Sequence, residues 1–195
     1  MSNKYRLDPA DTMFLIIDVQ TNLAAAMKKE VISIVEDNIN IIIKGSRELN
    51  IPILCTEQYR KGLGPTLDSI VKNIGTDFKP IEKLSFSACG EAAFQDLCKD
   101  INKRYVMISG IESHVCVLQT TLDLLAQGHT VHIISDAVCS RYKNDWKNAL
   151  EFLRGAGAII STTEIAVFQL LQKAGTPTFK VISPMFKNKR VYRPL

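Results

Sequence analysis

The feature that most constrains this chain is a regular alternation of short apolar runs with longer amphipathic segments. Met13–Ile17 is an unbroken apolar run that ends at Asp18, as expected of a strand buried on both faces of a parallel sheet. Residues 31–49 then carry apolar side chains at helical spacing, which predicts a long helix. By the same criteria we expect further strands over 51–56, 80–84, 105–109, 130–135 and 158–161, and further helices over 67–74, 91–101, 115–126, 144–154 and 164–173.

Strands that alternate with helices of this length imply βαβ crossovers, a parallel sheet, and helices on both faces of that sheet. The predicted fold is therefore a three-layer α/β/α sandwich with a central, mostly parallel, six-stranded sheet. With 195 residues, 46% of them hydrophobic, the chain fits a single domain over 1–195. We expect 176–195 to form a C-terminal tail, whose basic residues fit a solvated segment at least as well as a binding patch.

Composition argues against several classes of partner and location. The formal charge of +4 comes from 24 basic and 20 acidic residues that are mostly interspersed, so we expect no nucleic-acid or membrane partner. Charged residues interrupt the N-terminus before any apolar run, unlike a signal peptide, and no apolar stretch approaches the roughly 20 residues that span a bilayer. Five cysteines without a CxxC pair indicate free thiols in a reducing compartment, so we predict a cytoplasmic protein.

Polar residues at the ends of the predicted strands define a candidate site. In open α/β sheets, ligands bind beyond the carboxyl ends of the strands, near the point where the strand order reverses. The residues that fall at these ends are Asp18, Gln20, Thr56, Glu57, Lys83, Gly110 and Asp136.

Cys116 follows the fourth predicted strand, which ends at Gly110. A helix that begins around Ser113, a good N-cap residue, would place Cys116 in its first turn. There the free N–H groups and the positive end of the helix dipole favour a thiolate and can hold a developing oxyanion. By its position alone, Cys116 fits a buried, small apolar residue equally well.

Asp18 and Lys83 also have simpler interpretations when each is considered alone. Asp18 fits the N-cap of a following helix, and Lys83 fits a solvated lysine. Together with Cys116 they form a coherent catalytic device, because a carboxylate can take the thiol proton and a lysine can balance both negative charges. We therefore expect the Asp18 carboxylate, the Lys83 ammonium and the Cys116 sulfur to lie close together.

The order of these motifs resembles the isochorismatase-like cysteine hydrolases, which include nicotinamidases, N-carbamoylsarcosine amidase and isochorismatase. The resemblance extends over roughly residues 10 to 172 and is strongest to the isochorismatase domain-containing proteins. It lies in the Asp-x-Gln after the first strand, the lysine after the third, and the segments TEQYRKGLGPT (56–66), EKLSFSA (82–88), GIESHVC (110–116), TTLDLLAQGHTVHIISDAVCSR (120–141) and STTEIAVFQL (161–170).

This resemblance implies a role for each matching residue. Cys116 would be the nucleophile, Asp18 the general base and Lys83 the partner that stabilises charge. Family members carry a cis peptide in the turn before the nucleophile, which maps onto Ile111–Glu112, and the N–H groups of Glu112 and Cys116 would form the oxyanion hole. By location we expect Gln20, Tyr59 and Phe86 to contact substrate, although Tyr59 and Phe86 fit a core position equally well.

The chain departs from the nicotinamidases at their metal site. Those enzymes bind a metal through an Asp-x-His pair and a second histidine, and the corresponding segment 55–60 contains no histidine. We expect surface roles for His129 and His132, and a His114 side chain that diverges from Cys116. The sequence therefore predicts neither a metal nor a cofactor and argues against nicotinamide as substrate.

The retained cysteine favours hydrolysis of a C–N bond in a small amide or carbamoyl compound through a thioester acyl-enzyme. Two alternatives stay open. One is an isochorismatase-type hydrolase that cleaves a vinyl ether with Asp18 and without the cysteine, and the other is a non-catalytic binding or scaffold protein. We expect a small-molecule substrate and, because several family members assemble, a homo-oligomer.

Overall fold

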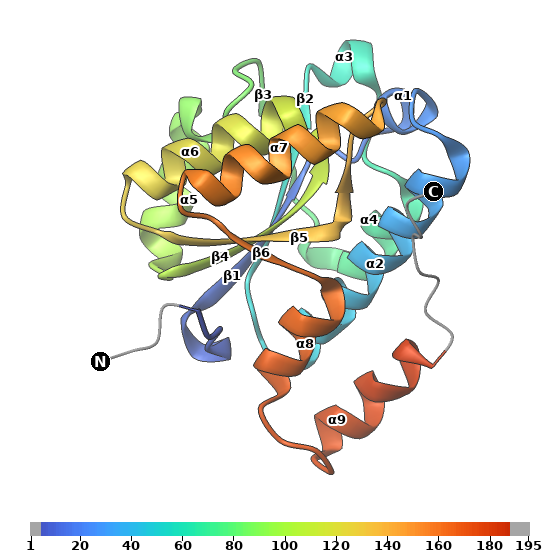
Figure 1. Cartoon of the computed structure of the whole chain (residues 1–195), viewed down its shortest axis with the longest axis vertical. Helices are drawn as coiled ribbons and strands as arrows, with labels where there is room; N and C mark the ends of the chain where they lie inside the picture. Colours follow the sequence, from blue (N-terminus) through green and yellow to red (C-terminus); the bar gives the residue numbers. More distant parts are fainter. Residues whose placement is uncertain (1–4, 188–195) are drawn as a thin grey trace.

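The computed structural model describes residues 5–187 and contains one six-stranded sheet (Figure 1). The strand order is β3-β2-β1-β4-β5-β6, and every neighbouring pair is parallel. The predicted α/β/α architecture is confirmed, and the sheet is parallel throughout rather than mostly so. Its strands are β1 (Thr12–Ile17), β2 (Ile53–Gln58), β3 (Ile81–Lys83), β4 (Tyr105–Ile111), β5 (Thr130–Cys139) and β6 (Ile159–Ser161).

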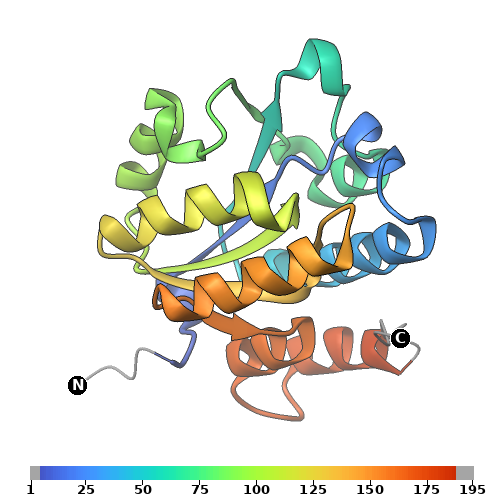
Figure 2. The same cartoon turned by 45° about the horizontal axis from the view of Figure 1, so that its top comes forward.

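Helices cover both faces of this sheet (Figures 1 and 2). One face carries α5, α6 and α7, and the other carries α2, α4, α8 and α9. No helix within residues 5–187 combines the length and apolarity needed to cross a bilayer. The helices are α1 (Thr21–Ala25), α2 (Lys29–Glu48), α3 (Arg60–Leu63), α4 (Asp68–Ile74), α5 (Ala92–Ile101), α6 (Leu118–Ala126), α7 (Lys143–Gly155), α8 (Thr163–Leu171) and α9 (Pro177–Ile182); the 3₁₀ turns are η1 (Pro9–Asp11), η2 (Gly75–Asp77), η3 (Ala88–Gly90) and η5 (Ser183–Phe186), and η4 (Ser113–Val117) is a π-helical turn.

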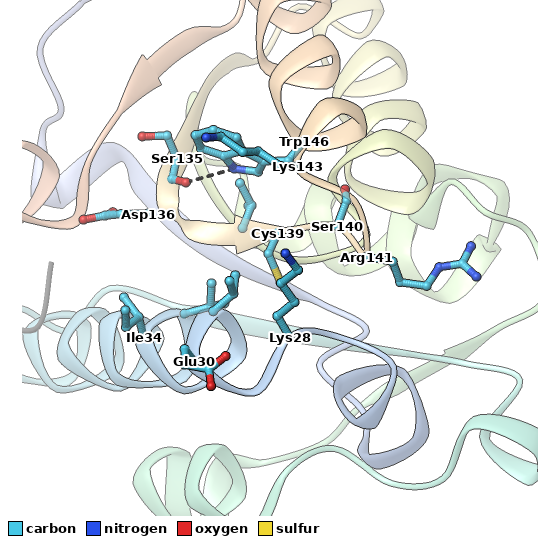
Figure 3. A pocket seen from close by; sticks show the side chains of 13 residues that line it. Lys28, Glu30, Ile34, Ser135, Asp136, Cys139, Ser140, Arg141, Lys143 and Trp146 are labelled. Atoms are coloured by element: carbon cyan, nitrogen blue, oxygen red, sulfur yellow. Dashed lines mark hydrogen bonds between the residues drawn. The ribbon is translucent and has the colours of Figure 1, made fainter. Parts of the chain in front are cut away.

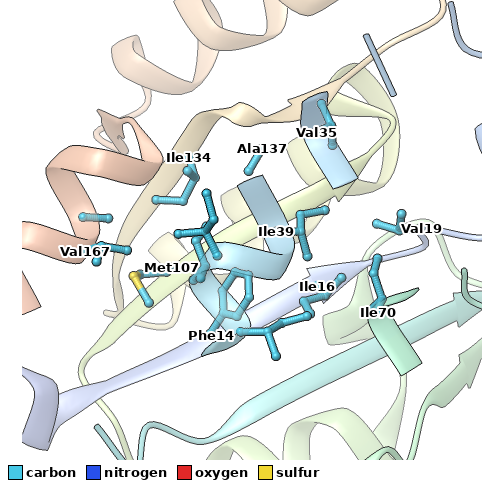
Figure 4. Close-up of a cluster of buried hydrophobic side chains, with 14 of the residues drawn as sticks. Phe14, Ile16, Val19, Val35, Ile39, Ile70, Met107, Ile134, Ala137 and Val167 are labelled. Carbon is cyan, nitrogen blue, oxygen red and sulfur yellow. The ribbon is translucent and has the colours of Figure 1, made fainter. Parts of the chain in front are cut away.

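The two core layers meet at β1, all six residues of which are buried. Phe14 and Ile16 point toward α2, where they join Ile39 in one apolar cluster (Figure 4). Leu15 and Ile17 belong to the cluster on the opposite face. Because successive side chains of a strand point to opposite faces, an unbroken apolar run is what a strand covered on both sides requires.

The predicted C-terminal tail is wrong where the structure describes it. Residues 177–186 form α9 and η5, and the Ile182 side chain is fully buried beside α2. The Phe179 ring lies edge-on to Phe168 of α8, with ring centroids 6.2 Å apart. Apolar side chains therefore dock this segment on the sandwich. The remaining predicted tail, with Lys189, Arg190 and Arg193, lies outside the described residues.

The fifth strand is longer than predicted. It does not stop at Ser135 but continues to Cys139, so Asp136 lies within the strand and not at its end. A register shift in its pairing with β4 accommodates the extra length. Because β6 pairs only with His132–Ile134, no strand within residues 5–187 lies along the outer side of the second half of β5, which borders a cavity there (Figure 3).

Candidate active site

Asp18 and Lys83 form a buried ion pair at the carboxyl end of the sheet. Their strands, β1 and β3, lie on either side of β2, and the Asp18 Oδ2 to Lys83 Nζ distance is 2.8 Å. Neither side chain is exposed. The Thr56 hydroxyl, two residues before the end of β2, donates a 2.7 Å hydrogen bond to Asp18 Oδ1. The N-cap interpretation of Asp18 and the solvated interpretation of Lys83 are therefore wrong.

The Lys83 ammonium has a full set of acceptors. Besides Asp18 it donates to Gln58 Oε1 at 2.6 Å and to the carbonyl oxygens of Phe86 and Ser85 at 3.0 and 3.2 Å. A buried ammonium needs such compensation, because its transfer out of water is otherwise costly. Sequence reasoning missed Gln58, although this residue is the last of β2 and the strand-end criterion would have included it.

The backbone around Asp18 takes up an unusual conformation. Asp18 has φ 53°, in the left-handed region, and its N–H donates to the Thr56 carbonyl oxygen at 3.2 Å. Gly110 is paired with Ile17 across β1 and β4 and has φ 128°, and a Cβ atom there would lie 2.0 Å from the Ile17 carbonyl oxygen. Only glycine permits this approach. The close contact brings the end of β4 next to Asp18.

Residues 111–116, which we name the nucleophile turn after the role predicted for Cys116, run from the end of β4 into the π-helical turn that contains Cys116. The Ile111–Glu112 peptide bond is cis. Ser113 is not an N-cap as predicted, because the chain passes through a π-helical turn over Ser113–Val117 before α6 begins at Leu118. A π turn is a local widening of the helix that is common at functional sites. The Cys116 side chain at this turn is only 5% exposed.

Burial raises the pKa of the Cys116 thiol to about 12. The negative charge of Asp18 and a hydrogen bond to it contribute to this rise, while the ammonium of Lys83 acts against it. These interactions indicate that the sulfur lies near both charged groups. That the three residues act together in catalysis stays a prediction. The expected preference for a thiolate is wrong for the resting site, however, because desolvation disfavours the charged form more than Lys83 favours it.

Two side-chain contacts anchor the nucleophile turn to the end of β5. The Glu112 carboxylate accepts hydrogen bonds from the Arg141 N–H at 3.0 Å and from Arg141 Nε at 3.1 Å. His114 Nδ1 lies 2.9 Å from the Ser140 hydroxyl oxygen. That its side chain diverges from Cys116 stays a prediction. The side chains of the turn therefore position its backbone, and neither contact was evident from the sequence.

The three residues predicted to contact substrate occupy different environments. The amide of Gln20 is buried, and it donates to the carbonyl oxygens of Gln58 and Gly64 at 3.0 and 2.6 Å. Tyr59 and Phe86 are 52% and 53% exposed, so the core interpretation is wrong for both. Both adjoin Lys83, since the Tyr59 N–H donates to the Lys83 carbonyl oxygen and Phe86 accepts from its ammonium. Contact of the three with substrate stays a prediction.

The histidines do not form a metal centre in the part of the chain that the structure describes. No group of three or more His, Cys, Asp or Glu side chains is arranged to hold a metal ion within residues 5–187. The expected surface position of His132 is wrong, since its side chain is fully buried in β5 against the Tyr105 ring. That the protein works without a metal or cofactor stays a prediction.

Comparison with known sequences identifies close relatives along nearly the whole chain. The family model of the isochorismatase domain matches residues 12–165. Isochorismatase family protein 1A of Dictyostelium discoideum is 40% identical over 197 residues, covering 98% of this chain and 94% of that protein. Isochorismatase domain-containing protein 2 of Danio rerio is 37% identical over 181 residues, covering 92% of this chain and 89% of that protein.

Solved structures show the same fold. A Caenorhabditis elegans protein described as MAR1 ribonuclease superposes with a TM-score of 0.89 at 33% identity, covering 97% of this chain and 98% of that one. The YcaC gene product of Escherichia coli, described as an octameric hydrolase of unknown specificity, has a TM-score of 0.87 at 20% identity, with 97% and 93% covered. The second likeness concerns the fold alone.

Proposed function

The chain belongs to the isochorismatase family, and we propose that it is a cysteine hydrolase that cleaves the C–N bond of a small amide or carbamoyl compound. The observation that carries this proposal is the buried Asp18–Lys83 ion pair, 2.8 Å long, beside the Cys116 thiol. An ion pair that is wholly removed from water is expensive to maintain and contributes little net stability. Its position next to a cysteine is explained by catalysis.

In the first half of the reaction, the Cys116 thiol gives its proton to Asp18 while the sulfur forms a bond to the substrate carbonyl carbon. The thiol is neutral until attack, because its pKa is raised to about 12. As Asp18 becomes neutral, the Lys83 ammonium shifts its pairing to the developing negative charge. The N–H groups of Glu112 and Cys116 would hold the oxyanion of the tetrahedral intermediate.

In the second half, the C–N bond breaks and the leaving nitrogen takes the proton from Asp18, which leaves a thioester on Cys116. A water molecule then attacks the thioester, with Asp18 accepting a proton from it. Collapse of this intermediate breaks the C–S bond, releases the acid product and returns the proton to the sulfur. The Asp18–Lys83 pair is thus restored after each turnover, and no external cofactor takes part.

The surroundings of the site favour a small substrate. The reacting groups are buried, and the exposed apolar side chains next to Lys83 belong to Tyr59, Leu84 and Phe86. We propose that these side chains border the entrance to the site, where a compact compound with an apolar substituent would bind more readily than a polymer. We also propose a cytoplasmic homo-oligomer; the octameric state of the E. coli hydrolase with this fold supports the assembly.

A hydrolysis screen tests the proposal. Purified protein is incubated with small primary amides, ureides and isochorismate, and ammonia, amine or pyruvate release is measured, with Cys116→Ala as the control variant. Turnover of an amide or ureide that requires Cys116 supports the proposal. Turnover of isochorismate that survives in Cys116→Ser would instead support the vinyl-ether mechanism through Asp18.

Two further outcomes would contradict the amidase proposal. A short RNA included in the screen tests the activity after which the C. elegans relative is described. Cleavage of that RNA, abolished in Cys116→Ala, would replace the amide substrate with a nucleic acid. A Cys116 thiol that reacts with no small electrophile, together with no turnover of any compound, would favour the non-catalytic binding protein.

A further inference from the structure

A cavity of about 610 Å³ lies at the outer edge of β5, apart from the candidate active site. It forms because β6 covers only the first part of β5, so that α2 and α7 face each other beyond the end of β6 (Figure 3). We name this space the edge cavity; its lining residues are Lys28, Glu30, Val31, Ile34, Val35, Ser135, Asp136, Val138, Cys139, Ser140, Arg141, Lys143 and Trp146. Neither Asp18, Lys83 nor Cys116 is among them.

The floor of the edge cavity is apolar, and two carbonyl oxygens of β5 beside it accept hydrogen bonds. Val35 and Val138 contribute aliphatic surface, and Trp146 contributes an indole ring. In the part of β5 that β6 leaves uncovered, the Ser135 carbonyl oxygen accepts a hydrogen bond from Trp146 Nε1 at 3.3 Å. The Asp136 carbonyl oxygen accepts one from the side-chain amide of Asn38 at 2.6 Å. A volume of this size with an aromatic wall is typical of a site for a small organic molecule.

Two lysines give the mouth of the edge cavity a basic character. Lys28 is the N-cap residue of α2, and Lys143 is the first residue of α7. Both are exposed and line the same space from opposite helices. Each ammonium adds to the positive end of a helix dipole, where an acidic group is normally favoured. With Arg141, these lysines outnumber the two acidic side chains, Glu30 and Asp136, that line the same space, and this balance favours an anionic ligand.

Two acidic side chains, Asp136 and Glu30, also line the edge cavity. The Asp136 carboxylate accepts from the backbone N–H and the hydroxyl of Thr163, at 2.7 and 2.8 Å, at the start of α8. The Arg141 guanidinium is directed to Glu112 and is therefore engaged outside the edge cavity. Glu30 is exposed and lies in the first turn of α2, where the helix dipole already stabilises it.

We propose that the edge cavity is a second ligand site, which binds a small monocarboxylate with an aromatic or branched apolar body. The carboxylate lies between Lys28 and Lys143, and the apolar body rests on Val35, Val138 and the Trp146 indole. The proposal does not depend on the hydrolase reaction, because the site shares no residue with the proposed catalytic set.

Trp146 makes the proposal directly measurable, since it is the single tryptophan of the chain. The full-length protein is titrated with 4-phenylbutanoate, and separately with the uncharged 4-phenylbutan-1-ol, while tryptophan emission is recorded. We expect a saturable change with the carboxylate and weaker binding of the alcohol. Lys28→Gln should weaken binding of the carboxylate about three- to tenfold and leave that of the alcohol unchanged, as expected for loss of one partly exposed charge contact.

Control variants separate the site from general effects of charge. Lys147→Gln removes an exposed positive charge from the same helix as Trp146 but outside the edge cavity, and should leave both affinities unchanged. Ile34→Phe should abolish binding of both probes by filling the cavity, and thermal unfolding checks that each variant is folded. Cys116→Ala should bind the carboxylate normally, which distinguishes this site from the proposed active site.

Several outcomes would overturn the proposal. No saturable change in emission, equal affinity for the carboxylate and the alcohol, or an effect of Lys147→Gln as large as that of Lys28→Gln would each do so. An emission spectrum that changes with protein concentration, combined with loss of probe binding in the assembled protein, would show that a second copy of the chain occupies the cavity instead.

Discussion

The candidate active site and the edge cavity use charge in opposite ways. In the first, Asp18 and Lys83 are fully buried and satisfy each other at 2.8 Å. In the second, Lys28 and Lys143 are exposed around an apolar floor. The two regions meet where Arg141 bonds to Glu112 and Ser140 contacts His114 of the nucleophile turn.

The difference in burial of the charged side chains indicates which function each region is suited to. Buried charges in a low-dielectric setting interact strongly and are held in one geometry, which suits proton transfer and charge stabilisation. Exposed lysines are hydrated and mobile, and they contribute selectivity to binding more than they contribute stability. Substitutions should therefore have large effects in the first region and small effects in the second.

The largest effect should follow from Cys116→Ala. If the sulfur is the nucleophile, turnover of an amide found in the screen should fall by roughly 10⁴-fold or more, because the acyl-enzyme forms on this sulfur. Steady-state kinetics measures this. The matched variant Cys139→Ala removes an equally buried thiol from the wall of the edge cavity and should change turnover by less than about threefold. Similar losses of turnover in Cys116→Ala and Cys139→Ala would contradict a special role of the Cys116 sulfur.

The next largest effect concerns stability. Lys83→Met should lower the free energy of unfolding by about 3–5 kcal/mol, because Asp18 is left buried and unpaired. Denaturant unfolding measures this, and Lys143→Met at the edge cavity should stay within about 0.5 kcal/mol of the parent protein. The double variant Asp18→Leu with Lys83→Met should recover much of the loss. A Lys83→Met variant as stable as the parent would show that the pair is not isolated from water.

A third prediction concerns the backbone on which the site is built. Gly110→Ala should lower the free energy of unfolding by roughly 2–4 kcal/mol, since the alanine Cβ would lie 2.0 Å from the Ile17 carbonyl oxygen. Gly128→Ala is the matched control, because Gly128 also has a positive φ, of 89°, but nothing lies within 4 Å of its Cβ position. The control should cost only the conformational strain of about 1 kcal/mol. Equal losses, measured by thermal unfolding, would mean that the close strand approach is relaxed in solution.

A smaller effect is expected in the pH dependence of alkylation. The pKa values of both Cys116 and Cys139 are raised to about 12, so the thiolate fraction of each should rise about tenfold per pH unit between pH 7 and 10. Iodoacetamide labelling, resolved by peptide mass spectrometry, measures both residues in one sample. Of the five cysteines we expect Cys116 to label fastest near neutral pH, because Asp18 can accept its proton and Lys83 can stabilise the thiolate as the sulfur attacks. A plateau for Cys116 near pH 7 would show a thiolate in the resting protein.

The smallest effect should come from Lys28→Gln in the absence of ligand. The free energy of unfolding should change by less than about 0.5 kcal/mol, because an exposed ammonium is hydrated in both the folded and the unfolded state. Addition of 4-phenylbutanoate should then stabilise the parent protein more than the variant, as linkage requires of a ligand that binds only the folded state. A variant that loses several kcal/mol without ligand would place Lys28 in a structural role.

The sequence by itself determined the layers, the sheet and most of the candidate site. Apolar strands and amphipathic helices have local periodicities that a single chain displays, and β1 is readable because burial on both faces demands an unbroken apolar run. Asp18, Lys83 and Cys116 were predictable because polar residues that end parallel strands converge on one edge of the sheet. Their catalytic roles were expected from the family resemblance and not from spacing.

The tertiary structure alone decided the rest, because each remaining feature depends on neighbours that are distant in sequence. Ser135 and Asp136 are polar and look like the end of a strand, yet pairing with the end of β4 carries β5 on to Cys139. Likewise, Gln58 becomes a partner of Lys83 only when β2 and β3 lie side by side. The raised pKa of Cys116 reflects how completely surrounding segments exclude water, and no local pattern encodes that desolvation.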